Sequence, residues 1–136
     1  MKLLSLDIGD KRIGTAVTDP DSKIVFGLTV IERKNRDKDL QEIKRLVDVH
    51  EIEKIVVGIP LTDDNRISTQ GKKIVRFVSR LKKKVPVPIV LWDERYSSRE
   101  AAEILVSRGE SLDDSIDRVA AAVILQRYID ATGGDS

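Results

Sequence analysis

Three carboxylates occupy positions in this sequence where apolar residues would be expected. Asp7 and Glu94 each close a strand-like apolar run, and Asp117 opens a helical apolar run that continues to Leu125. Burying one unpaired carboxylate is costly, and gathering several raises the pKa of at least one unless a cation joins them. A divalent metal ion is the simplest such cation. The pattern therefore predicts an acidic metal site formed by Asp7, Glu94 and Asp117, a type of site suited to phosphodiester chemistry.

Each carboxylate also has a purely structural interpretation. Asp7, followed by Gly9, is compatible with the start of a tight turn, and Glu94 with an ion pair at a strand end. Acidic residues in the first turn of a helix are favoured by the helix dipole, which suits Asp113 and Asp114 better than Asp117.

The helical projection of Asp117 favours the metal site over these alternatives. Its stripe is otherwise apolar and contains Ala121, Ile124 and Tyr128. The spacing predicts that Asp117 faces the core, and the small residues 120–122 predict that the helix approaches the sheet closely.

Composition restricts the metal and the class of protein. The 136 residues, 40% hydrophobic and 35% charged, fit one globular domain spanning 1–136. Without cysteine and with His50 as the one histidine, the sequence excludes thiolate sites and sites with two imidazoles. Oxygen-ligated Mg²⁺ or Mn²⁺ is favoured. No apolar run is long enough for a bilayer, so we expect a cytoplasmic protein without a membrane partner.

Basic residues are concentrated although the net charge is only +1. The helical spacing of residues 72–84 predicts one cationic face, formed by Lys73, Arg76, Arg80 and Lys84. Such a face is either simply solvated or contacts a phosphate backbone. We expect Lys73, Arg76 and Arg80 to bind substrate.

Three further cations lie next to the predicted acidic residues. Lys11 and Arg12 follow the first carboxylate, and Arg95 follows Glu94. They are expected to hold a substrate phosphate, although a lone surface cation is an equally simple interpretation of Lys11 and Arg12. Aromatic residues are only 4% of the chain, which argues against recognition of single strands by base stacking.

The periodicity predicts elements that bring the carboxylates together. Alternating apolar residues indicate an antiparallel meander of strands over 2–8, 12–18 and 23–32. Buried parallel strands are expected over 54–59 and 87–94, with helices over 37–50, after the loop 60–68, near 98–107 and over 113–129. The fold class is therefore α/β, with a five-stranded mixed sheet and helices on both faces. Asp7 and Glu94 end parallel strands, where such sheets bind ligands.

Four ordered blocks give the chain a specific resemblance. They cover residues 6–16, 56–61, 93–95 and 117–126, and together they resemble the YqgF/RuvX family of RNase H-like proteins. The resemblance implies an RNase H-like fold related to the RuvC junction resolvases. It places the family's acidic triad on Asp7, Glu94 and Asp117. Two Mg²⁺ or Mn²⁺ ions are the expected cofactors, with Asp7 bridging them.

The resemblance also implies an activity. It predicts a hydrolase acting on phosphodiester bonds, in 5′-end maturation of pre-16S rRNA during ribosome biogenesis or in resolution of Holliday junctions. The expected partners are structured RNA or branched DNA, and the expected state is a monomer or weak homodimer. The loops 62–66 and 96–98 depart from the family pattern, which concerns substrate preference rather than the metal site.

Two other function classes stay open. One is a non-catalytic RNA-binding module of ribosome assembly that keeps the acidic cluster. The other is a nucleotide-binding protein that uses the actin-like opening around Asp7; the short chain and the lack of a P-loop sequence argue against it.

Overall fold

The computed structural model describes residues 1–62, 64, 66–93 and 115–133. Its elements, in chain order, are β1 (Leu3–Ile8), β2 (Arg12–Thr18), β3 (Val25–Glu32), α1 (Arg36–Val49), β4 (Lys54–Ile59), α2 (Thr69–Leu81), β5 (Ile89–Asp93) and α4 (Ser115–Thr132). Each agrees with a predicted element except at its ends. The helix predicted near 98–107 lies outside the described residues.

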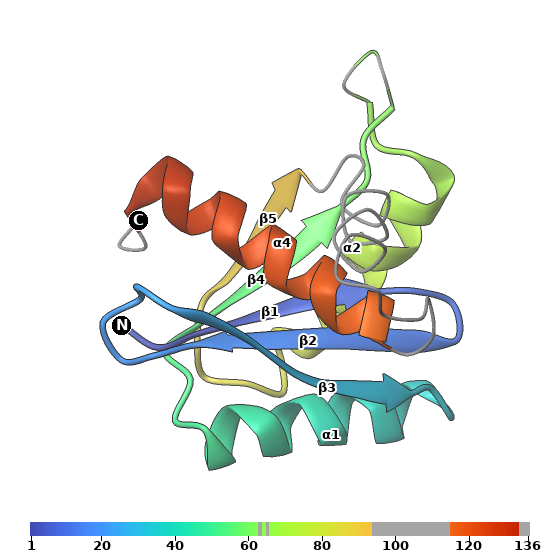
Figure 1. Cartoon of the computed structure of the whole chain (residues 1–136). Coiled ribbons are helices and arrows are strands. Elements are labelled where there is room, and N and C mark those ends of the chain that lie inside the picture. The colour runs from blue at the N-terminus through green and yellow to red at the C-terminus, as the bar shows by residue number, and fades with distance from the viewer. Residues whose placement is uncertain (63, 65, 94–114, 134–136) are drawn as a thin grey trace.

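The strands form one mixed sheet in the order β3-β2-β1-β4-β5. The β1–β2 and β2–β3 pairs are antiparallel, and the β1–β4 and β4–β5 pairs are parallel. Helix α4 covers one face of this sheet, and α1 and α2 cover the other (Figure 1). The predicted five-stranded mixed sheet with helices on both faces is confirmed.

Strand β1 shows how the two faces divide. Leu4, Leu6 and Ile8 point into the larger core, with α1 and α2. The alternate positions point toward α4, where Leu3 is buried in the second core and Ser5 donates to the Ala121 carbonyl at 2.7 Å. Asp7, two residues further along the strand, belongs to this α4 face.

Side-chain caps fix where α1 and α2 begin. The Asn35 carboxamide accepts from the Lys38 amide at 2.9 Å, and the Ser68 hydroxyl accepts from the Gly71 amide at 3.0 Å. Both satisfy amides that have no partner within the helix. The Ser68 hydroxyl also donates to the Pro60 carbonyl, which anchors the start of α2 to the carboxyl end of β4.

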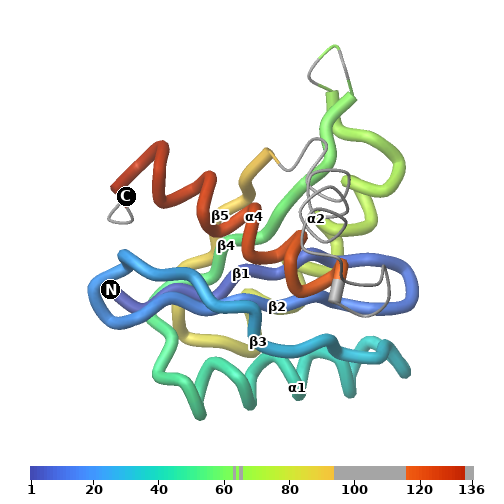
Figure 2. Tube along the Cα trace, in the orientation of Figure 1, coloured from blue at the N-terminus to red at the C-terminus, as the bar shows by residue number. Residues whose placement is uncertain are grey.

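Helix α4 touches the sheet at glycines. A Cβ placed on Gly14 would lie 2.0 Å from the Asp117 carbonyl oxygen, and one on Gly27 would lie 3.3 Å from the Arg118 Cβ. The first turn of α4 therefore rests on β2 and β3, and the helix runs obliquely across the sheet from there (Figure 2). The close approach predicted from residues 120–122 is present, but the strand glycines do most to permit it.

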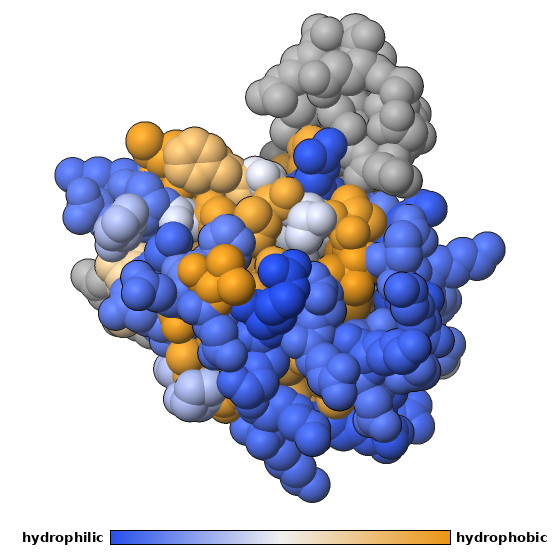
Figure 3. Space-filling view, turned by 90° about the horizontal axis from the view of Figure 1, so that it is seen from below, coloured by the Kyte–Doolittle hydropathy of each residue, from blue (hydrophilic) through white to orange (hydrophobic). Residues whose placement is uncertain are grey.

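The surface on the α1 side is mostly hydrophilic, with scattered hydrophobic patches (Figure 3). Within the described part of the chain, no helix combines the length and apolarity that a membrane crossing requires.

Candidate acidic site and its surroundings

Asp7 and the first turn of α4, which carries Asp117, lie on the same face at the carboxyl end of β1. Asp7 pairs across the β1–β2 ladder with Gly14, and directly opposed residues of an antiparallel pair project to the same face. The missing side chain of Gly14 would collide with the Asp117 backbone, so the first turn of α4 lies directly over the neighbour of Asp7. The backbone of Asp117 thus lies beside the strand residue that opposes Asp7, although Asp7 and Asp117 are far apart in the sequence.

Arg12 holds Asp117 in place. Its Nε donates to the Asp117 Oδ2 at 2.8 Å, and the side chains are 42% and 21% exposed. An ion pair this exposed contributes little to stability, but it fixes the rotamer of Asp117. Arg12, predicted to hold a phosphate, therefore reaches the acidic site itself. Asp117 lies in the first turn of α4 as described, where the helix dipole also favours its charge.

Asp93 does not belong to this pair. Its neighbour Trp92 packs toward α4, edge-on against Tyr128 with ring centroids 5.2 Å apart. Alternation along β5 directs the exposed Asp93 to the other face. The predicted Glu94 and Arg95 lie outside the described residues, as do most of the residues of the 62–66 and 96–98 loops that differ from the family pattern.

The donor set at Asp7 and Asp117 fits a hard divalent cation. Carboxylate oxygens are the ligands that Mg²⁺ and Mn²⁺ prefer, and Gly14 leaves the strand beside Asp7 without a side chain. Among the described residues, no three His, Cys, Asp or Glu side chains are grouped closely enough to form a metal site. The pair thus supplies part of the predicted triad, and Glu94 is the expected third ligand.

A basic hollow lies at the same end of the sheet, on the face opposite to Asp7. It has a volume of about 380 Å³, and its lining residues are Arg33, Arg36, Lys73, Arg76, Phe77 and Arg80. Lys73 approaches Asp10 of the β1–β2 turn at 3.8 Å, and Lys11 is exposed in that turn. Lys84, predicted to share the basic face, follows the end of α2 and does not line the hollow.

Sequence reasoning missed Arg33 and Arg36, which lie about 40 positions before the basic helix. Only the tertiary fold brings them to Lys73, Arg76 and Arg80, with which they line the hollow. Sequence reasoning also missed that the backbone of Asp117 packs against Gly14. A signal for Gly14 existed, since an isolated glycine within a strand pattern indicates close approach of another backbone.

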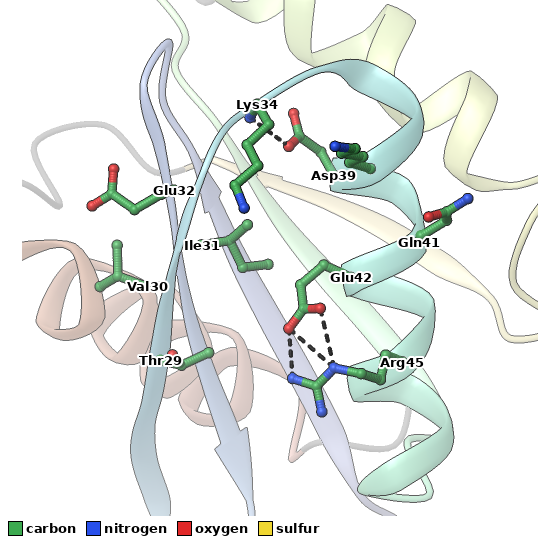
Figure 4. A pocket seen from close by; sticks show the side chains of 10 residues that line it. Thr29, Val30, Ile31, Glu32, Lys34, Asp39, Gln41, Glu42 and Arg45 are labelled. Atoms are coloured by element: carbon green, nitrogen blue, oxygen red, sulfur yellow. Dashed lines mark hydrogen bonds and ion pairs between the residues drawn. The ribbon is translucent and has the colours of Figure 1, made fainter.

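A larger groove of about 550 Å³ lies between β3 and α1 (Figure 4). Its charges largely neutralise one another. Glu42 accepts from Arg45 at 3.1 Å, and the buried Asp39 accepts from Arg33 and from the Lys34 amide at the same distance. Because this groove presents mainly paired charges and lies away from Asp7, it is the weaker candidate for a functional site.

Comparison with known proteins decides the family. A family model described as "RuvX: Holliday junction resolvase" matches residues 1–131. The chain belongs to the RuvX family. A RuvX relative from Thermoanaerobacter pseudethanolicus, named "Putative pre-16S rRNA nuclease", is 38% identical over 135 residues, covering 96% of this chain and 97% of the relative. One of the same name from Syntrophus aciditrophicus is 40% identical over 134 residues, covering 96% and 89%. The predicted resemblance is confirmed.

Solved structures confirm the RNase H-like fold of this RuvX chain. Thermus thermophilus RuvC, in complex with a Holliday junction substrate, superposes with a TM-score of 0.63 at 15% identity, covering 98% of this chain and 97% of RuvC. Fowlpox virus resolvase, in complex with Holliday junction DNA, gives a TM-score of 0.62 at 10% identity, covering 96% and 98%. At these identities the likeness concerns the fold alone.

Proposed function

We propose that this RuvX protein is a metal-dependent nuclease that hydrolyses phosphodiester bonds in the 5′-end maturation of pre-16S rRNA. The observation that carries the proposal is the convergence of Asp7 and Asp117 at the carboxyl end of β1, imposed by the contact between Gly14 and Asp117. The curated relatives named for pre-16S rRNA cleavage supply the substrate. Such a nuclease would act in the bacterial cytoplasm.

Three carboxylates would hold the metal in this proposal. Asp7 and Asp117, with Glu94, would hold Mg²⁺ or Mn²⁺. When bound, such ions supply a reactive water at neutral pH and neutralise charge on the phosphate.

The cations nearest the site would position the substrate. Arg12 keeps the Asp117 carboxylate oriented, and with Lys11 and Arg95 it would contact the scissile phosphate. The guanidinium of Arg12 presents several N–H donors, of which Nε is used by Asp117, so the others are available to a phosphate.

The substitution Asp7→Asn tests the proposal directly. It keeps the size of the side chain and removes the charge, so we expect Mg²⁺-dependent cleavage of a pre-16S leader RNA to fall by about a thousandfold or more. The folded state should persist, as measured by circular dichroism and urea unfolding. Asp21→Asn is the matched control, because Asp21 is exposed in the β2–β3 turn at the opposite end of the sheet. Full cleavage by the Asp7→Asn protein would rule out the mechanism.

Holliday junction resolution is the second candidate, favoured by the description of the RuvX family model. A resolvase cuts two strands symmetrically and so normally acts as a dimer, whereas a precursor-RNA nuclease can act as a monomer. Cleavage of a four-way junction and of a pre-16S leader, measured side by side with the solution mass, separates the two. Binding of RNA without cleavage of either substrate in Mg²⁺ or Mn²⁺ would instead indicate a non-catalytic assembly module.

A further inference from the structure

The basic hollow defined by Arg33, Arg36, Lys73, Arg76, Phe77 and Arg80 contains cations that the fold does not use. Within the described part of the chain, the side chains of Arg76 and Arg80 make no hydrogen bond or ion pair. Arg36 and Lys73 have only long contacts, at 3.9 Å to Asp37 and 3.8 Å to Asp10. Like charges one turn apart on a helix disfavour folding slightly, and a bound anion would relieve this repulsion.

Arg33 gives the hollow a rigid floor. Its Nε donates to the buried Asp39 at 3.1 Å, its Nη1 donates to the Gly9 carbonyl at 2.8 Å, and its guanidinium lies 5.1 Å from the Phe77 ring centroid. These contacts join the β1–β2 turn, the start of α1 and the middle of α2. Because Asp39 neutralises Arg33, the charge available to a ligand comes from Arg36, Lys73, Arg76 and Arg80.

The hollow and the acidic site lie on opposite faces at the same end of the sheet, with the β1–β2 turn between them. Gly9, which Arg33 contacts, is two residues from Asp7, and Lys73 reaches Asp10 of the same turn. From Lys73 to Arg80 the cations extend about 10 Å along α2, given a rise of about 1.5 Å per residue. A nucleic acid whose scissile bond lies at Asp7 would pass the β1–β2 turn to reach these cations.

The chemistry of the lining favours a paired strand over an unpaired one. Unpaired strands are bound largely by stacking of bases on exposed aromatic rings. The one aromatic residue of the hollow, Phe77, is buried and lies beneath Arg33. The hollow therefore offers charge without a stacking surface, which suits the phosphate backbone of a duplex.

We propose that the basic hollow binds the phosphate backbone of a duplex segment that flanks the cleaved bond. The proposal rests on the proposed nuclease function, since the ligand is part of the substrate. It assigns Arg36, Lys73, Arg76 and Arg80 to substrate affinity and Arg33 to their positioning, and it gives none of them a part in bond cleavage.

Equilibrium binding of a short RNA duplex tests the hollow. The double variant Arg76→Gln/Arg80→Gln is prepared in the Asp7→Asn protein, which prevents cleavage during the measurement. Losing two phosphate contacts should weaken binding about tenfold at moderate salt and lower the slope of log K against log salt by about 1.8. Arg76→Lys/Arg80→Lys keeps both charges and should recover most of that slope.

The matched control is Lys82→Gln/Lys83→Gln, which removes the same charge at the end of α2 outside the hollow. It should bind the duplex within about twofold of the parent protein, since neither lysine lines the hollow. An equal loss in the control, or an unchanged slope in the Arg76/Arg80 variant, would overturn the proposal. A larger loss for single-stranded RNA of the same sequence would overturn the assignment to a duplex.

Cleavage assays keep this result separate from the proposed function. With the catalytic residues intact, the Arg76/Arg80 variant should raise KM for a duplex-flanked RNA and leave kcat unchanged. If neither the parent protein nor the variant cleaves any RNA, the proposed function is wrong. The slopes of log K against log salt then still decide whether the hollow binds a duplex.

Discussion

The two faces of the sheet are built from different residues. The face toward α1 and α2 presents large branched side chains from β1 and β4, such as Leu4, Leu6, Ile55 and Val57, all fully buried. The face toward α4 presents small or polar residues at its centre, among them Ser5, Gly14 and Ala16. Both faces bury apolar side chains, but at the α4 face the strand glycines also let a helix backbone touch the strands.

This difference implies that the α1/α2 face mainly contributes stability, whereas the α4 face mainly positions the proposed site. Helices that pack through large side chains keep their axes about 8–10 Å from their neighbours and adjust by changing rotamers. At the α4 face, backbone contact fixes the position of Asp117 relative to Asp7 without relying on rotamers. Substitutions on the α4 face should thus affect cleavage first, and those on the other face should affect stability first.

The largest effect is expected for Gly14→Ala. Its Cβ would lie 2.0 Å from a backbone carbonyl oxygen of α4, so the helix must move away from Asp7. We expect about 3 kcal/mol of lost stability and a loss of cleavage larger than that destabilisation explains. Urea unfolding and cleavage below the melting temperature measure the two effects.

Gly27→Ala is the control for Gly14→Ala. Its nearest neighbour would be the Arg118 Cβ at 3.3 Å, and the expected cost is below about 1 kcal/mol. Comparable costs at both glycines would show that α4 is not held at Gly14.

Leu6→Ala tests the face toward α1 and α2, where a substitution should lower stability without lowering cleavage. Leu6 is fully buried among α1 and α2, so the cavity should cost about 3 kcal/mol of unfolding free energy. Cleavage per folded molecule should remain near the parent value, because Asp7 and α4 lie on the other face. Leu91→Ala, at a leucine that is 40% exposed, is the control and should cost much less. A loss of turnover per folded molecule in Leu6→Ala would contradict the idea that this face affects stability rather than cleavage.

Arg12→Gln should alter the metal site with little effect on stability. The exposed Arg12–Asp117 pair is worth about 0.5 kcal/mol. Removing a cation beside the carboxylates should raise the affinity for Mn²⁺ about threefold, and kcat should fall because Asp117 loses its fixed rotamer. Titration followed by Mn²⁺ EPR gives the first quantity. Arg45→Gln, which breaks a similar pair on α1, should change neither one.

The smallest effect concerns the pH dependence of the Glu42–Arg45 pair. The hydrogen bond from Arg45 holds the pKa of the Glu42 carboxyl below its usual value. A carboxyl with a lowered folded-state pKa stabilises the protein above its usual pKa, and this contribution disappears as pH falls through the lowered value. Because both side chains are over a third exposed, Glu42→Gln should change the acid limb of stability by less than about 0.5 kcal/mol. A larger change in acid unfolding would contradict this.

Local patterns predicted much of the fold and part of the site. Strand alternation and helical spacing depend on neighbours in sequence, and they predicted that Asp7 ends a buried strand and that Asp117 shares the buried stripe of Tyr128. The contact of Asp117 with Gly14, its bond to Arg12 and the approach of Arg33 to Phe77 depend on which elements become neighbours. No local period encodes such contacts, so the structure had to supply them.

The contact of α4 with Gly14 bears on which ion the proposed metal site would accept. Mg²⁺ requires ligand oxygens at about 2.0–2.1 Å, whereas Ca²⁺ takes longer bonds and more ligands. A cage with one wall of helix backbone pressed against a strand has little capacity to widen. Discrimination by ionic radius would therefore be built into the polypeptide scaffold, and relaxing it would require remodelling the strand beneath the helix rather than exchanging a ligand.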